Sequence, residues 1–114
     1  MNPQIISALN DAARIVNENA ENKGFHSDSF EEFVPKTCAN IHAEVSELWE
    51  AYRKGILNKS CDKNCGLTNA EEELADIIIR ALDTSSRLGL DIGNAIAKKH
   101  AYNTTRPFKH GKIA

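Results

Sequence analysis

Apolar residues recur at helical spacing through nearly the whole chain, and this periodicity constrains the fold more than any other feature. They return every three or four positions in four separate segments, which is the pattern of an amphipathic helix. No segment shows the alternation that is typical of a strand. We therefore expect an all-α, four-helix bundle-like fold with antiparallel neighbours. The expected helices cover about residues 3–20, 35–54, 68–88 and 91–102.

Capping residues mark where some of these helices start. Thr68, with Glu71 three residues later, forms a capping-box pattern, and the acidic residues that follow suit the positive end of a helix dipole. Asp91 is expected to cap the fourth helix. Ser29 and Glu32 repeat the capping-box spacing between the first two helices, where we expect a connection or a short helical turn.

The length and composition suit one small domain. A chain of 114 residues with 41% hydrophobic residues can bury one core but hardly two. We therefore interpret residues 1–114 as a single domain. It contains a polar loop insert at about 56–67 and a basic, irregular tail at 103–114.

Charge and cysteine content exclude several classes of protein. A net charge of −2 provides no general basic field for nucleic acid or an anionic membrane. No apolar run approaches the roughly 20 residues of a membrane span. Three cysteines are an odd number, which argues against a closed disulfide framework. We expect a cytoplasmic protein that binds neither membranes nor nucleic acid.

Two pairs of carboxylates share one local pattern. Glu44 and Glu47 lie three residues apart in the second expected helix, and Glu73 and Asp76 repeat this spacing in the third. At about 100° per residue, each pair lies on one face of its helix, about a turn apart. An isolated pair of this kind is usually a solvated helix face. Two matching pairs favour a shared site.

The apolar stripes place both pairs at the same offset from the expected core. The stripe of the second helix centres near Val45 and Tyr52, and that of the third near Leu74 and Ala81. Both are expected to face the core. If the helices pack antiparallel, the four carboxylates converge on one cleft. Their mutual repulsion is removed by a hard divalent cation such as Mg²⁺, with Mn²⁺ as a substitute.

A basic segment follows the acidic pairs. Lys99 and Asn103 share a face if the fourth helix reaches residue 103, and Arg106 lies just beyond. Cations that face a carboxylate-bound metal suit a polyphosphate. The simpler interpretation is a solubilising tail. Trp49 can stack on a nucleobase, although a lone tryptophan on a helix is more often part of a core or an interface.

The loop insert carries Cys61 and Cys65. Structural zinc usually takes four ligands, and Cys38 is the only other cysteine in the chain. We therefore expect free thiols rather than a zinc site.

These motifs together resemble the MazG-like nucleotide pyrophosphohydrolases of the all-α NTP pyrophosphatase superfamily. The resemblance covers about residues 38–112 and is strongest at residues 72–80, while residues 100–112 are similar to the tails of small members. The insert with the two cysteines departs from the commoner family pattern. The motifs that carry the resemblance are Glu44-x-x-Glu47, Glu73-x-x-Asp76 and Lys99-x-x-x-Asn103-x-x-Arg106.

The resemblance implies an enzyme that converts a nucleoside triphosphate to the monophosphate and pyrophosphate with Mg²⁺. It also implies a bundle whose active site is completed in a homodimer, sometimes within a tetramer. Carried over by motif, the metal ligands and catalytic residues are Glu44, Glu47, Glu73 and Asp76. The residues implied to contact the phosphates, or to hold the tail over them, are Lys99, Asn103 and Arg106.

Two other classes of function stay open. A helical adaptor would bind a basic partner through the acidic faces, sensitive to salt and indifferent to Mg²⁺. A nucleotide-sensing regulator would bind a nucleotide in the same pocket without turnover. The sequence does not specify the preferred base or sugar.

Overall fold

The structure, a computed structural model that describes residues 1–113, confirms the all-α prediction. Within this part of the chain there is no strand, only an isolated bridge between Ser60 and Thr68. Ala114, the last residue of the expected tail, lies outside the described residues. The helices are α1 (Pro3–Asn22), α2 (Phe30–Arg53), α3 (Asn69–Arg87), α4 (Ile92–Thr104) and the short 3-10 helix η1 (Phe108–Gly111).

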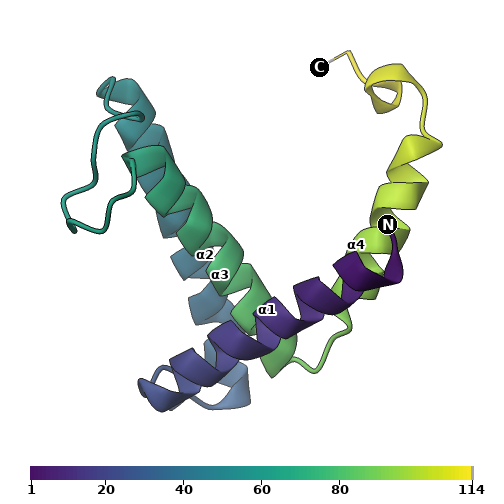
Figure 1. The fold of residues 1–114 in the computed structure, drawn as a ribbon, viewed down its shortest axis with the longest axis horizontal. Coiled ribbons are helices and arrows are strands. Elements are labelled where there is room, and N and C mark those ends of the chain that lie inside the picture. The colour runs from purple at the N-terminus through teal and green to yellow at the C-terminus, as the bar shows by residue number, and fades with distance from the viewer. Residues whose placement is uncertain (114) are drawn as a thin grey trace.

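The four α-helices form an open V (Figure 1). Helices α2 and α3 lie side by side in one arm, and α4 lies in the other with the N-terminal part of α1. Helix α1 crosses the base and packs against both α3 and α4. The radius of gyration is 16.4 Å, whereas about 13 Å is typical of a compact domain of this length. One chain therefore leaves much of its helix surface uncovered.

The crossing of α1 and α4 depends on a glycine. Gly93 is buried, and a Cβ atom at this position would lie 2.2 Å from the carbonyl oxygen of Ile6. Asn10 on α1 accepts a hydrogen bond from the Gly93 amide at 2.9 Å and donates one to Asp91 at 2.9 Å. Because Gly93 has no side chain, the backbones of α1 and α4 can come into contact, and the hydrogen bonds of Asn10 determine the position of the crossing.

Contacts attach α1, the connection after it and the start of α2 to α3. Asp83 accepts a hydrogen bond from Asn17 at 3.0 Å and lies 2.9 Å from Nε2 of His26. The Arg87 guanidinium lies over the Phe33 ring, 3.9 Å from its centroid. Phe33 is one of the few buried apolar side chains. The base of the V is therefore held by both packing and polar contacts.

The predicted start of α2 near Pro35 is wrong. The helix begins at Phe30, and Pro35 lies inside it. Pro35 is the sixth residue of the helix, where it removes the hydrogen bond to the carbonyl of residue 31 and crowds that carbonyl. The contact of Phe33 with Arg87 helps to stabilise the extra turn that precedes Pro35. Ser29 is the N-cap, as its position suggested, but its side chain makes no capping hydrogen bond.

Other boundary predictions are confirmed. Thr68 and Glu71 form the complete capping box at the start of α3. The Asp91 side chain accepts a hydrogen bond from the Asn94 amide and caps α4. The tail, however, is not wholly irregular. Phe108–Gly111 forms a 3-10 turn, with Lys109 at positive φ.

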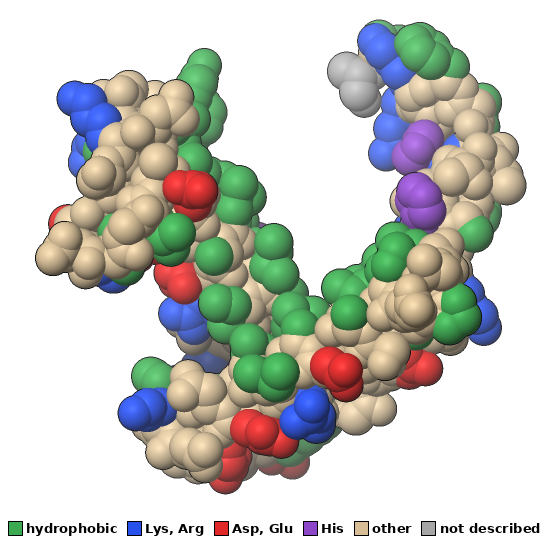
Figure 2. Space-filling view, viewed as in Figure 1, with side chains coloured by type: hydrophobic (Ala, Val, Ile, Leu, Met, Phe, Trp, Pro, Cys, Tyr) green, Lys and Arg blue, Asp and Glu red, His purple; other side chains and the backbone are tan. Residues whose placement is uncertain are grey.

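The apolar stripes of α2 and α3 were predicted to face the core. This prediction is wrong for the single chain, in which the stripes are exposed. Val45, Tyr52 and Leu74 are 48%, 61% and 48% exposed, and Ala81 is also exposed. Figure 2 shows hydrophobic side chains along the edge of the α2–α3 arm that faces the opening of the V. Helices α2 and α3 pack against each other through a neighbouring face, and within residues 1–113 the stripes stay exposed. No helix in residues 1–113 is long and apolar enough to cross a membrane.

Candidate metal centre

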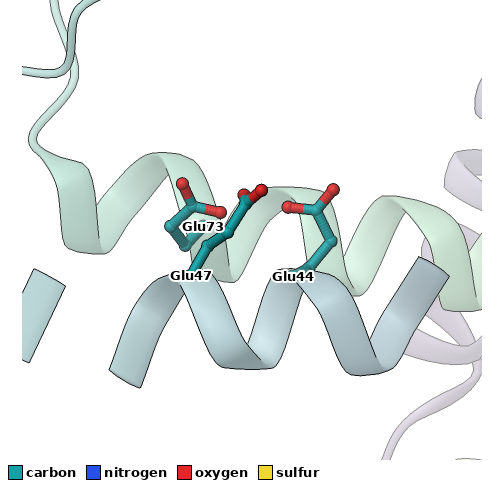
Figure 3. A group of neighbouring side chains, drawn as sticks. All are labelled: Glu44, Glu47 and Glu73. Atoms are coloured by element: carbon teal, nitrogen blue, oxygen red, sulfur yellow. The ribbon is translucent and has the colours of Figure 1, made fainter. Parts of the chain in front are cut away.

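The antiparallel packing of α2 and α3 brings acidic residues of both helices together. Glu44 on α2 contacts Arg80 on α3, and Glu47, one turn later on α2, lies beside Glu73, which comes earlier on α3. Carboxylate oxygens of Glu44, Glu47 and Glu73 all lie within 4.8 Å of one another. Figure 3 shows the three side chains turned to the same side of the helix pair, with Glu47 between the other two. We call these three residues the acidic cluster.

Two members of the acidic cluster are buried with unsatisfied oxygen atoms. Glu44 is 8% exposed and Glu73 is 9% exposed. Among residues 1–113, Oε2 of each has no hydrogen-bond partner. A buried carboxylate oxygen without a partner costs free energy, and a second carboxylate nearby adds repulsion. An oxygen-binding divalent cation removes both costs, so this set of donors fits Mg²⁺.

The electrostatics of Glu73 reflect the same crowding. Burial, followed by the proximity of Glu47 and Glu44, raises the pKa of Glu73 to about 8. Without a cation, the cluster therefore keeps a proton on Glu73 at neutral pH. Such a strongly perturbed carboxyl group in a cluster is typical of a functional site.

Asp76 lies one turn further along α3 and is half-buried. Burial raises its pKa first, and the negative charge of Glu44 adds to the effect. Its carboxylate does not belong to the acidic cluster. The structure thus brings three of the four expected metal ligands together and places Asp76 beside them, within the electrostatic influence of Glu44.

Arg80 is a site residue that the sequence analysis missed. Its Nε donates a hydrogen bond to Oε1 of Glu44 at 3.1 Å, and its Nη2 lies 3.1 Å from the same oxygen. This contact holds one oxygen of Glu44 and leaves Oε2 free of it. Arg80 follows Glu73 by seven residues, or two helical turns, so the two residues share a helix face. This spacing could have identified Arg80 as a candidate from the sequence.

The loop between α2 and α3 covers one side of the acidic cluster. Lys63 forms an ion pair with the buried Glu72, next to Glu73 in the chain. A cavity of about 410 Å³ lies between this loop and the helices. Its lining includes Glu47, Glu73 and Lys63. The cavity thus combines acidic groups with a cation, as a site for a metal-bound anion requires.

The expected phosphate-binding residues lie elsewhere in the single chain. Lys99 and Asn103 line a separate cavity of about 420 Å³ on α4, in the opposite arm of the V (Figure 1). The Arg106 guanidinium lies 5.7 Å from the centroid of the Tyr102 ring. Oδ1 of Asn103 is buried and has no hydrogen-bond partner in the part of the chain that the structure describes. One chain therefore does not bring this basic set to the acidic cluster.

Trp49 lies neither in the core of the chain nor in the lining of the cavity between the loop and the acidic cluster. It is 58% exposed and stacks on Tyr52, with ring centroids 5.5 Å apart. Both residues lie on the exposed stripe of α2. Trp49 is therefore accessible to a ligand or to another chain.

Comparison with known proteins gave no match to a family model, to a curated protein or to a solved structure. The interpretation of the acidic cluster therefore depends on its own geometry and chemistry.

Proposed function

We propose that the protein is a Mg²⁺-dependent hydrolase that converts nucleoside triphosphates to monophosphates and pyrophosphate. The observation that carries this proposal is the acidic cluster, with three carboxylates within 4.8 Å and two buried oxygens without partners. The motif order that resembles MazG-like pyrophosphohydrolases supports the choice of reaction. Mg²⁺ is the expected ion because it binds oxygen ligands and retains positions for substrate phosphates.

The chain divides the work of the site among its own residues. Glu44, Glu47 and Glu73 would hold the ion, and Asp76, one turn further along α3 and within the electrostatic influence of Glu44, would be the fourth acidic group. Arg80 keeps Glu44 in place. When bound, the ion supplies neutralising charge for phosphate oxygens and orientation for the attacking water.

We further propose that a second copy of the chain completes both the helix bundle and the site. The stripes of α2 and α3 are half-exposed, and a monomer seldom exposes such large contiguous apolar surface. Lys99 lies on α4, in the arm opposite α2 and α3, and Arg106 follows the end of that helix. A homodimer that covers the stripes would bring the basic arm of one chain to the acidic arm of the other, where the charges are complementary.

The test of the catalytic proposal is a panel of canonical and modified nucleoside triphosphates with Mg²⁺. Monophosphate and pyrophosphate are the expected products. Glu73→Gln or Asp76→Asn should lower pyrophosphate release by more than roughly 100-fold with unchanged helix content. Glu18→Gln is the matched control, because Glu18 is an exposed acid on α1 that pairs only with Arg14.

Other results would refute this function. Turnover that survives both substitutions would show that the carboxylates are not the site. Thermal stabilisation by nucleotides without monophosphate would identify a sensor, and partner binding indifferent to Mg²⁺ would identify an adaptor.

The dimer is tested by substitution in the stripe. Leu74→Asp should convert the dimer to a monomer at micromolar concentration, because it buries a charge in the apolar interface. Ile15→Asp is the control, since Ile15 is similarly exposed, at 57%, on α1. Light scattering gives the mass of each variant. A wild-type monomer, or a Leu74→Asp variant that still dimerises, would contradict the proposed interface.

A further inference from the structure

Two thiols meet in the loop between α2 and α3. Sγ of Cys61 and Sγ of Cys65 are 3.1 Å apart, and neither residue is in a disulfide. A disulfide bond is about 2.05 Å long, so bond formation needs a shift of only about 1 Å. Cys38, on α2, is exposed and has no such neighbour.

The backbone of the loop holds the thiols in this position. The Cys61 amide donates a hydrogen bond to the Leu67 carbonyl at 2.9 Å, and the Asn69 amide donates one to the Lys59 carbonyl at 2.9 Å. Between the cysteines the chain turns back through Asn64, which has a φ of 52°. The close approach of the thiols is therefore built into a hydrogen-bonded loop.

We propose that Cys61 and Cys65 are a redox modification site, a dithiol that closes to an intrachain disulfide and restrains the loop beside the acidic cluster. This inference does not rest on the proposed function, since it concerns the loop and its thiols alone. The oxidant is a low-molecular-weight disulfide of the glutathione type.

The disulfide forms by two successive thiol–disulfide exchange steps. Cys65 is exposed. Its thiolate attacks the oxidant, forms a mixed disulfide and releases one thiol. The Cys61 thiolate then attacks the Cys65 sulfur, which closes the intrachain bond and releases the second thiol. The dithiol loses two electrons and two protons, and both appear on the two released thiols.

The local environment suits this division of roles. Cys61 is buried, so it meets the mixed disulfide of its neighbour rather than the oxidant in solution. The pKa of the Cys61 thiol is lowered first by the hydrogen bond from Cys65 and then by one from the Lys63 backbone. The backbone contact does not need the Cys65 proton, so it still favours the Cys61 thiolate after Cys65 has formed the mixed disulfide. The contact between the thiols raises the pKa of Cys65, so Cys65 attacks first because it is exposed and not because its thiol is acidic.

The position of Lys63 links the disulfide to the cavity beside the acidic cluster. Lys63 lies between the two cysteines, forms an ion pair with Glu72, and lines the cavity with Glu47 and Glu73. Closing the five-residue ring restrains the part of the loop that carries Lys63. The oxidised protein therefore keeps this wall of the cavity in place.

The test treats the full chain with mixtures of oxidised and reduced glutathione and measures intact mass. Cys38→Ser should become about 2 Da lighter without an adduct, and the wild type should show the same loss apart from any glutathione adduct on the exposed Cys38; reduction should reverse these changes. Cys65→Ser should form no intrachain bond. Because Cys65 is exposed, this variant is expected to keep its fold. A wild type that yields only glutathione adducts, bonds between chains, or a bond to Cys38 would overturn the proposal.

Hydrogen exchange tests the restraint on the loop. Oxidation should slow exchange of the Cys61 and Asn69 amides in the wild type, because their hydrogen bonds span the closed ring. Cys65→Ser treated in the same way should show no slowing. Equal exchange in the oxidised and reduced wild type would overturn the claim that the disulfide restrains the loop.

Discussion

Binding of Mg²⁺ should release a proton from Glu73 at neutral pH. The pKa of Glu73 is raised to about 8, and a carboxyl group must be ionised to bind the metal. At pH 7, a group with this pKa is about 90% protonated, so about 0.9 proton should leave per ion bound. The affinity for Mg²⁺ should therefore increase as the pH rises towards 8.

The magnitude follows from the ionised fraction of Glu73. Between pH 6.5 and pH 8.5 this fraction rises from about 0.03 to about 0.76 for a pKa near 8. The affinity should rise by about 25-fold over this range, which equals about 2 kcal/mol. Above pH 8.5 the increase should level off, because little protonated Glu73 is left.

Calorimetric titration in two buffers with different ionisation enthalpies measures both the affinity and the number of protons released. Glu73→Gln is the matched variant, since it keeps the shape of the side chain and removes its proton. Its weaker binding should lack the proton release. Proton release near zero in the wild type at pH 7, together with an affinity independent of pH, would refute the assignment of Glu73 as a ligand.

The same shift affects folding stability in the absence of metal. The ordinary pKa of 4.5 applies to the unfolded chain, whereas Glu73 in the folded protein has a pKa of about 8. Between these values the folded state binds the extra proton, so the free energy of unfolding falls as the pH rises through this window. The metal-free protein should accordingly unfold at a lower temperature at pH 8.5 than at pH 6, and Mg²⁺ should reverse the loss.

Two further predictions concern the frame that positions the site. Gly93→Ala should lower the free energy of unfolding by about 1–3 kcal/mol, because its Cβ would meet the Ile6 backbone; chemical denaturation gives this value, and wild-type stability would contradict the crossing of α1 and α4. Thr68→Ala should cost about 1 kcal/mol through loss of the capping box. Thr68→Ser, which keeps the hydroxyl group, is its control, and equal losses in the two variants would rule out the cap as the cause.

Local patterns in the chain were sufficient to place most of the helices and their caps. Thr68 and Asp91 cap helices where their spacing predicted, because capping depends on residues within one turn. The separation of Glu44 from Glu47 also defined a shared helix face, since helical geometry relates such positions directly. The start of α2 did not follow from local pattern, because the packing of Phe33 extends the helix beyond the boundary that Pro35 suggested.

The packing of one helix against another determined which face of each became buried. Periodicity gives the angle between a stripe and an acidic pair on one helix, but it does not identify the face that a neighbour covers. In this chain α2 and α3 meet through Glu44 and Glu73, while Val45 and Leu74 stay exposed. The partner of Glu44, Arg80, and the ion pair of Lys63 with Glu72 likewise depend on contacts between segments distant in sequence. Such contacts depend on the positions of whole elements in space, which no residue spacing within one element encodes.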